Sequence, residues 1–135
     1  KNTLGIQAAG NPYPDFKSLR DDITNRTISG AFRSGWIGDY PGLGNFLVPL
    51  YGTGGSSNDG DYSNPDFDAK LKEAAGAKTS EESNTLYNQS QETLFKDLPA
   101  IPLWYSNATG GYSENVSNVE FGWNSTPLYY KITRK

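Results

Sequence analysis

The sequence predicts an α/β domain, because an extended segment, a helical stripe and a second extended segment follow one another near its start. Residues 4–8 alternate apolar and other side chains, which is typical of a short strand. Phe16, Leu19 and Ile23 then recur at helical spacing, and residues 28–36 form a second extended segment. We therefore expect a βαβ unit with parallel strands and a right-handed crossover.

The helix of this unit has a recognisable start. Pro14 suits the first position of a helix, because its fixed φ angle already matches helical geometry. Asp15 suits the positive end of the helix dipole. The apolar stripe predicts that the helix continues to about Asn25.

Three more helices are expected further along the chain. Residues 45–51 form a short helix with Phe46, Leu47 and Leu50 inward, and the Gly-, Ser- and Asn-rich residues 52–60 form a mobile loop. Ser63 or Asn64 then caps the next helix. Pro65 and Asp66 occupy its first turn. Its apolar face consists of Phe67, Leu71, Ala74 and Ala75, and Gly76 ends the helix.

The last helix starts at residues 79–82 and must end before Pro99, since a proline disfavours helical geometry in the residue ahead of it. Its inward face is predicted to hold Tyr87, Gln91, Leu94 and Leu98. Residues 101–105 are expected to form a strand, and Pro102 places that strand at a sheet edge or a bulge. The tail, residues 119–132, holds two short aromatic-rich segments.

Composition excludes several classes of function. The chain has 135 residues, a formal charge of −3, and neither His nor Cys. Without Cys the chain has no thiolate chemistry, and without His it lacks the commonest general base and the commonest metal ligand. Apart from the last few residues no basic run is present to bind nucleic acid, and no apolar run is long enough to span a membrane.

The stretch that organises the chain is residues 34–41, Ser-Gly-Trp-Ile-Gly-Asp-Tyr-Pro. Asp39 follows the carboxyl end of the second predicted strand, and ligands of open α/β sheets bind at such ends. This predicts that Asp39 contacts a ligand and that Trp36 forms the wall beside it. The alternatives are that Asp39 only shapes a turn and that Trp36 belongs to the core.

Three ordered stretches carry a family resemblance: residues 35–41 with 45–47, residues 62–68, and residues 97–105. Together they resemble the C-terminal part of extracytoplasmic oligopeptide- and dipeptide-type solute-binding proteins of ABC importers. The resemblance implies one lobe of a two-lobe, type II periplasmic-binding-protein-like receptor, with a mixed sheet flanked by helices. It also implies that the chain is a fragment, with residues 1–105 in one lobe and residues 106–135 returning toward the other.

The resemblance also assigns roles to residues. It implies that Asp39 pairs with the free α-amino group of a ligand and that Trp36 walls a side-chain pocket. Tyr40, Trp104 and Tyr105 are further candidates to contact the ligand. Strand alternation would place Trp104 and Tyr105 on opposite faces, so that one of them faces the cleft. The Gly-Leu-Gly of residues 42–44 replaces the acid-Pro frequent in the family, which affects the local loop shape.

The predicted function is therefore substrate capture for an ABC importer: the receptor binds peptides between its lobes and delivers them to the permease. Oligosaccharide binding by the same fold is the alternative, with Trp36, Trp104 and Tyr105 stacking on sugar rings. An enzyme is not expected. A glycosidase would need two carboxylates at a catalytic distance, and nothing in the sequence places Asp39 and Glu120 at such a distance.

No cofactor and no metal are expected. The Asp residues between positions 59 and 68 do not have the spacing of a calcium-binding EF-hand loop, and helix capping explains them better. The resemblance implies a monomeric receptor outside the cytoplasm, either in the periplasm or held as a lipoprotein on the outer face of the cytoplasmic membrane.

Overall fold

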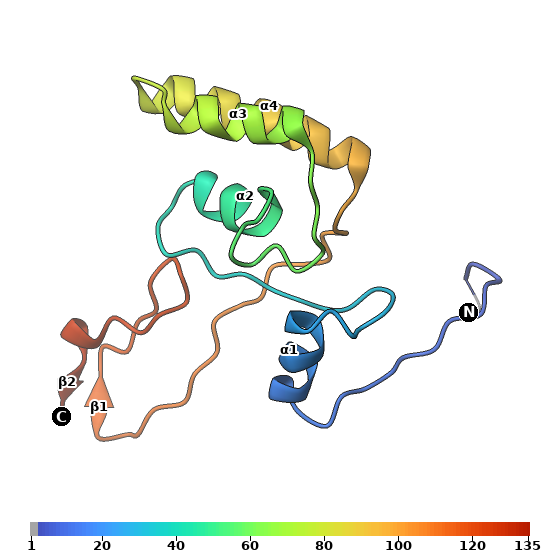
Figure 1. Cartoon of the computed structure of the whole chain (residues 1–135). Coiled ribbons are helices and arrows are strands. Elements are labelled where there is room, and N and C mark those ends of the chain that lie inside the picture. The colour runs from blue at the N-terminus through green and yellow to red at the C-terminus, as the bar shows by residue number, and fades with distance from the viewer. Residues whose placement is uncertain (1–2) are drawn as a thin grey trace. The chain divides into compact units, whose positions relative to one another are not determined.

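The computed structural model describes residues 3–135, and the chain divides into two compact units, Lys1–Arg33 and Ser34–Lys135 (Figure 1). The first unit contains one helix, α1 (Phe16–Thr24). The second unit contains the remaining elements, which are α2 (Gly44–Tyr51), α3 (Pro65–Ala75), α4 (Ser80–Asp97), β1 (Val116–Ser117), the 3₁₀ helix η1 (Tyr129–Lys131) and β2 (Thr133–Arg134).

The predicted first helix is confirmed, but it begins at Phe16 with Asp15 as its N-cap, so Pro14 lies before the helix and not in its first position. The Asp15 carboxylate accepts a 2.7 Å hydrogen bond from the backbone N–H of Ser18, and this bond holds the pKa of Asp15 below its usual value. Within the helix Ile23 is fully buried. Asp22 accepts hydrogen bonds from the hydroxyls of Tyr13 at 2.7 Å and Thr27 at 2.9 Å, which tie the segments just before and just after α1 to the helix.

The predicted parallel strands flanking α1 are wrong. Residues 4–8 and 28–36 lie outside every strand of the described chain. The side chains of Leu4 and Ile6 are 75% and 56% exposed, so the alternating pattern of residues 4–8 has no sheet or helix to cover it. Residues 4–6 form a turn and a bend, with Gly5 at φ 67°, and in the described chain residues 28–36 have no neighbouring strand to complete their hydrogen bonds.

The core of the second unit lies between α2, α3 and α4. Its buried members are Leu47, Phe67 and Leu71, one from α2 and two from α3. Around them pack the partly buried side chains of Leu43, Tyr51, Tyr62, Tyr87 and Leu94. The rings of Tyr62 and Phe67 meet edge to face with their centroids 5.7 Å apart. All three helices therefore contribute to one apolar cluster.

The ends of α3 and α4 follow the local sequence as predicted. The Asn64 side chain accepts hydrogen bonds from the N–H groups of Asp66 and Phe67, and the Thr79 side chain accepts one from Glu82. At its other end α4 stops at Leu98, which takes a left-handed conformation with φ 47° directly before Pro99. The proline therefore ends this helix where the sequence predicted.

The helices α3 and α4 pack against each other along their length. The two helices lie side by side (Figure 1), and the hydroxyl of Ser83 donates a 2.8 Å hydrogen bond to the Ala74 carbonyl. Ser90 is fully buried, and its hydroxyl donates a 2.7 Å hydrogen bond to the Tyr87 carbonyl. A small side chain that bonds to its own helix lets two backbones approach without leaving a buried polar group unpaired.

Three side chains predicted to face inward do not. Phe46 is 37% exposed and Leu98 is 60% exposed, and Ala75 is exposed as well. Phe46 and Leu47 are consecutive on α2, so one helical turn cannot direct both of them at α3. Leu47 takes the core position, while the Phe46 ring lies against Gly38 in the preceding loop.

The Gly-rich segment between α2 and α3 is a series of hydrogen-bonded turns around Asn58. This buried side chain donates to the carbonyls of Gly52 at 2.9 Å and Tyr62 at 2.7 Å, and it accepts from the Tyr62 N–H at 3.0 Å. A backbone bond from Ser57 to Pro49 closes the segment onto α2. The prediction of a mobile loop from composition missed this internal order.

The C-terminal part of the chain forms a small antiparallel sheet. Val116 pairs with Arg134 and Ser117 pairs with Thr133, and an isolated bridge joins Phe121 to Pro127. Residues 101–105 form no strand, so that prediction is wrong for this chain. The described residues therefore combine helices with a small sheet, in agreement with the broad fold class, but do not form the mixed sheet.

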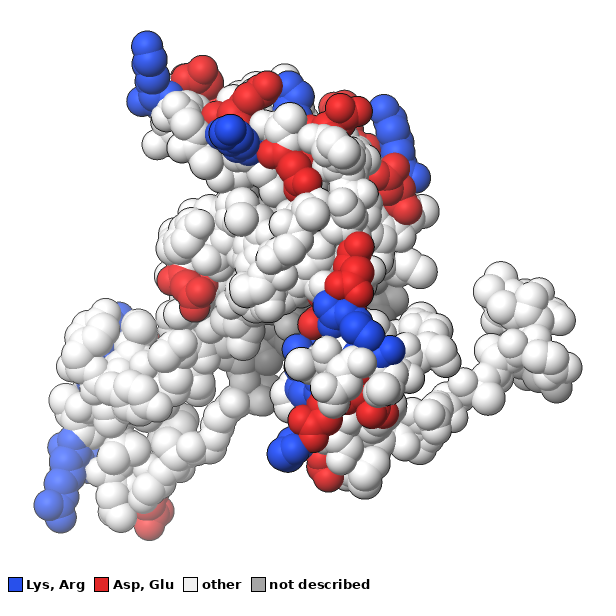
Figure 2. All heavy atoms as spheres, in the orientation of Figure 1, with Lys and Arg blue, Asp and Glu red and all other residues white. Residues whose placement is uncertain are grey.

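Charged side chains lie mixed in sign over α3 and α4 (Figure 2). Among residues 3–135, no helix combines the length and the apolar character needed to cross a membrane.

Candidate ligand-binding site

The candidate site is built by the loop that leads into α2 and by the first turn of that helix. Its central residue is Asn45, whose side chain is buried with 7% exposure. The Asn45 Oδ1 atom accepts a 2.8 Å hydrogen bond from the backbone N–H of Asp39. The same oxygen accepts a longer bond, 3.4 Å, from the indole Nε1–H of Trp36. One buried oxygen thus connects the two residues that the sequence predicted to act together.

Gly38 lets the loop lie this close to α2. A Cβ atom at position 38 would come within 3.1 Å of Asn45 Oδ1 and within 3.0 Å of the Phe46 ring. A larger side chain at position 38 would therefore force the Phe46 ring and the Asn45 amide to shift. Close packing at Gly38 and the two bonds to Asn45 together fix the course of residues 36–39.

The exposure of the two predicted residues differs in a way that suits a binding site. Trp36 is half-buried, while the Asp39 side chain is exposed. Within residues 3–135 the Asp39 carboxylate takes part in no hydrogen bond or ion pair; only its backbone N–H is engaged. The structure therefore fixes the backbone of Asp39 and leaves its charged group available beside an anchored indole.

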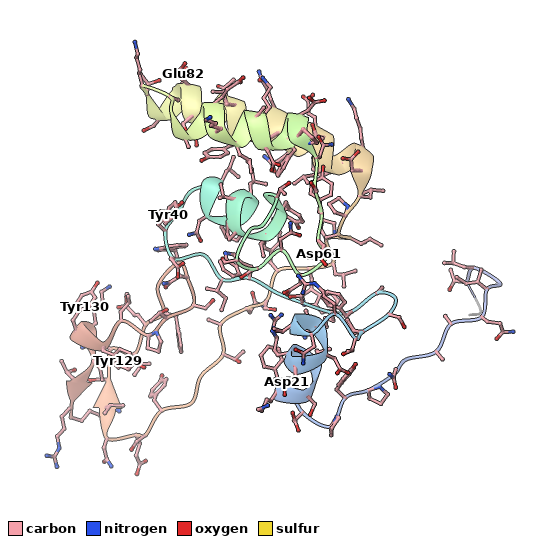
Figure 3. All side chains as sticks on the ribbon, in the orientation of Figure 1. Asp21, Tyr40, Asp61, Glu82, Tyr129 and Tyr130 are labelled. Atoms are coloured by element: carbon pink, nitrogen blue, oxygen red, sulfur yellow. The ribbon has the colours of Figure 1, made fainter. Side chains whose placement is uncertain are left out.

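Tyr40 lies on the same loop and is 54% exposed (Figure 3). The turn after it is tight, with the Gly42 N–H donating to the Tyr40 carbonyl at 2.9 Å. A Cβ at position 42 would meet the Tyr40 ring at 3.0 Å. A side chain at position 42 would therefore displace the Tyr40 ring from its present place.

The site is held in place from the far side by α4. The Tyr87 hydroxyl lies so close to Gly44 that a Cβ there would approach it to 2.7 Å. Burial raises the pKa of Tyr87, and the neighbouring Tyr40 adds to the rise. Contact with Tyr87 thus fixes the start of α2, which carries Asn45.

Trp104 and Tyr105 lie apart in sequence from this group, on the extended segment after α4. Trp104 is 62% exposed. Tyr105 is completely exposed, so the described chain does not bring its ring to the Trp36–Asp39 site. With no strand at residues 101–105, the expectation that one of the two faces a cleft stays a prediction.

Glu120, the possible second carboxylate of an enzyme, is occupied elsewhere. It forms an ion pair with Lys131, and this bond raises the pKa of the lysine. It takes no part in the hydrogen bonds that join Trp36, Asn45 and Asp39.

Sequence reasoning missed Asn45, although a signal was present. In α2, Gly-Asn-Phe-Leu-Val-Pro-Leu-Tyr, it is the one polar side chain among apolar neighbours. A polar residue in an apolar helix that packs on a core needs a partner, and here the partner lies in the loop before the helix.

Comparison with known proteins places this geometry in context. No model of a known protein family matches the sequence. Over 90 residues it is 38% identical to the heme-binding protein A of Haemophilus influenzae. Over 87 residues it is 33% identical to the periplasmic murein peptide-binding protein MppA of Escherichia coli and 25% identical to the oligopeptide-binding protein OppA of Bacillus subtilis.

Each of these similarities covers 63–64% of the chain but 16% of the relative, so the chain spans a small part of the length of the curated relatives it matches. The resemblance that the three motifs predicted is confirmed: the chain is similar to part of the solute-binding proteins of the oligopeptide type.

Proposed function

We propose that this chain is the C-terminal part of an extracytoplasmic receptor that captures peptides and delivers them to the permease of an ABC importer. The names of two relatives, a murein peptide-binding protein and an oligopeptide-binding protein, support a peptide ligand. The word periplasmic in one of these names supports a place outside the cytoplasm. All three relatives are named as binding proteins, which favours capture over catalysis.

The observation that carries the proposal is the arrangement of Trp36 and Asp39. A carboxylate with no partner inside the described chain stands beside an indole held by Asn45. Such a carboxylate suits the ammonium group of a peptide, because a charge-assisted hydrogen bond is strong once water is excluded. The indole supplies an apolar wall for a side chain.

The other candidate ligands are supported less well. One relative is named for haem, but this chain has no His, Cys or Met, which leaves Tyr as its only common axial ligand for haem iron. An oligosaccharide would use the aromatic rings of Trp36, Trp104 and Tyr105 and would leave the charge of Asp39 without a role. The peptide uses both features of the site.

In this proposal the longer receptor has two lobes of the type II periplasmic-binding-protein-like fold, which close on the ligand. Residues 1–105 supply most of one lobe, and residues 106–135 return toward the other. The receptor acts as a monomer without a cofactor or a metal, either free in the periplasm or anchored by lipid.

The test is to measure binding of short alanine peptides to the longer receptor by calorimetry. Asp39→Asn keeps the shape of the side chain and removes its charge. Loss of a charge-assisted hydrogen bond should weaken binding of free peptides about tenfold to a hundredfold, and binding of N-acetylated peptides should not change. The matched control is Asp66→Asn, the same change in the exposed first turn of α3.

Equal weakening of free and acetylated peptides by Asp39→Asn would show that Asp39 shapes the loop and does not anchor an amine. Unchanged binding of both, together with binding of oligosaccharides that Trp36→Ala abolishes, would favour the oligosaccharide receptor.

A further inference from the structure

The side chain of Asn45 makes a pattern of contacts that helix formation does not require. It lies in the first turn of α2, where a polar residue ordinarily caps the helix. The helix has no side-chain cap, however: its N-cap is Leu43. The Asn45 oxygen instead accepts bonds from outside the helix, from the Asp39 N–H and the Trp36 indole.

We propose that Asn45 is a positioning residue, which sets the affinity for the ligand by fixing the Trp36 ring and the Asp39 backbone. The proposal rests on the function proposed above, since it takes Trp36 and Asp39 as the groups that meet the peptide. Asn45 acts through its oxygen: the residue is 7% exposed, and that oxygen already accepts bonds from two donors.

The chemistry of the amide explains why asparagine suits this position. A carbonyl oxygen has two lone pairs, and here each accepts one donor. The group is neutral, so it adds no second negative charge next to the Asp39 carboxylate. Since the oxygen is buried, losing it would leave the Asp39 N–H without its partner and release the loop.

Both bonds act on the orientation of the site. The 2.8 Å bond fixes the backbone from which the Asp39 carboxylate projects. The 3.4 Å bond restricts rotation of the Trp36 ring about its side-chain torsions, since the indole N–H lies at the ring edge. A ligand that meets a fixed carboxylate and a fixed ring does not have to order them on binding, and this preorganisation strengthens affinity.

The first experiment needs no ligand and uses the 135-residue chain, ¹⁵N-labelled for NMR. In Asn45→Ala, the Trp36 indole proton and the Asp39 amide proton should both move upfield, and the Asp39 amide should exchange with solvent roughly tenfold faster or more. Asn45→Asp keeps an oxygen acceptor in the same place, so it should restore the slow exchange of the Asp39 amide.

The matched control is Asn58→Ala. Asn58 is an equally buried asparagine, 6% exposed against 7% for Asn45, and it holds the neighbouring loop through three hydrogen bonds. This variant should lower the melting temperature while the Trp36 and Asp39 signals stay in place. If Asn45→Ala lowers the melting temperature and leaves both signals where they were, Asn45 has only a structural role and the proposal is overturned.

The second experiment measures binding of alanine peptides with a free amino end to the longer receptor. Asn45→Ala alone should weaken binding about tenfold. Combined with Asp39→Asn, its additional effect should be smaller, because Asn45 acts partly through Asp39. If the double variant loses affinity by the full product of the two single losses, the proposal is overturned. Failure of the proposed function gives a different result: the Asp39→Asn receptor binds free peptides normally. In that case the NMR experiment alone decides the role of Asn45.

Discussion

The hydroxyl of Tyr62 donates a 2.6 Å hydrogen bond to the carboxylate of Asp97, 35 residues further along the chain. The Asn64 side chain, which caps α3, donates to the same oxygen of Asp97 at 2.8 Å. Asp97 is the last residue of α4. A single carboxylate thus connects the start of α3 to the end of α4, at the edge of the core that Tyr62 helps to cover.

This link predicts a dependence of stability on pH. The hydrogen bonds from Tyr62 and Asn64 hold the pKa of Asp97 below its ordinary value of 3.8. A lowered pKa stabilises the fold above pH 3.8, and that contribution is lost as the pH falls through the folded-state value. Burial and the bond to Asp97 raise the pKa of Tyr62 from 10.0 to about 12. This second contribution is complete below pH 10 and is lost as the pH rises to about 12.

Urea unfolding at a series of pH values measures the loss of stability at both acid and alkaline pH, and Tyr62→Phe serves as the comparison. The variant should be less stable than the parent at neutral pH and should lose part of the stability change between pH 10 and 12. Absorbance of the ionised phenols should show one tyrosine fewer with a pKa raised to about 12. Identical pH profiles for the two proteins would mean that the Tyr62–Asp97 bond does not contribute to stability in solution.

A second prediction concerns the core between the helices. Leu71 is 6% exposed and packs in the cluster with Leu47 and Phe67. Leu71→Ala removes buried methyl groups and leaves a cavity, so it should lower the free energy of unfolding by about 2–5 kcal/mol. Leu94→Ala should cost less, because Leu94 is partly buried at the margin of the same cluster.

The matched control for this prediction is Leu103→Ala, the same substitution at a side chain that is 66% exposed. It should change the free energy of unfolding by no more than about 0.5 kcal/mol. Thermal melting of the three variants decides the question: equal shifts for Leu71→Ala and Leu103→Ala would place the core elsewhere.

A third prediction separates the two predicted roles at the ligand site. Trp36→Ala removes the wall and leaves the Asp39 carboxylate in place. In the longer receptor it should weaken binding of peptides that carry phenylalanine more than binding of alanine peptides, because a larger side chain buries more area against the indole. Acetylation of the amino end should not alter this difference. An equal loss for both peptides would indicate that Trp36 only supports the loop.

The helices were predictable because their signals are local. Asn64 and Thr79 cap α3 and α4 within three residues of the N–H groups they satisfy, and Pro99 ends α4 next to the residue it restricts. The strands at residues 4–8 and 28–36 were not predictable in the same way. A strand depends on a distant partner, and the period of its side chains does not say whether that partner is present.

The candidate site was predictable in part. The spacing of Trp36 and Asp39 in one short loop made their proximity a sound expectation. Asn45 was missed because it acts through an amide oxygen, which neither apolar periodicity nor charge reveals. Ser90 was missed for a related reason: it is fully buried, yet its hydroxyl is satisfied within its own helix. Their partners are known only from the structure, although the place of Asn45 among the apolar residues of α2 marked it as a polar side chain that needs a partner.

The position of the helical core along the chain has a consequence for the order of folding. Every member of that core lies between Leu43 and Leu94, either on one of three consecutive helices or, as Leu43 and Tyr62 do, in the segment just before α2 or α3. Loop closure between such neighbours costs little entropy, and proteins rich in local contacts fold quickly. As the chain leaves the ribosome, the core has all its residues as soon as α4 has emerged. The aromatic segments that follow Pro99 then arrive at a helical unit that is already complete.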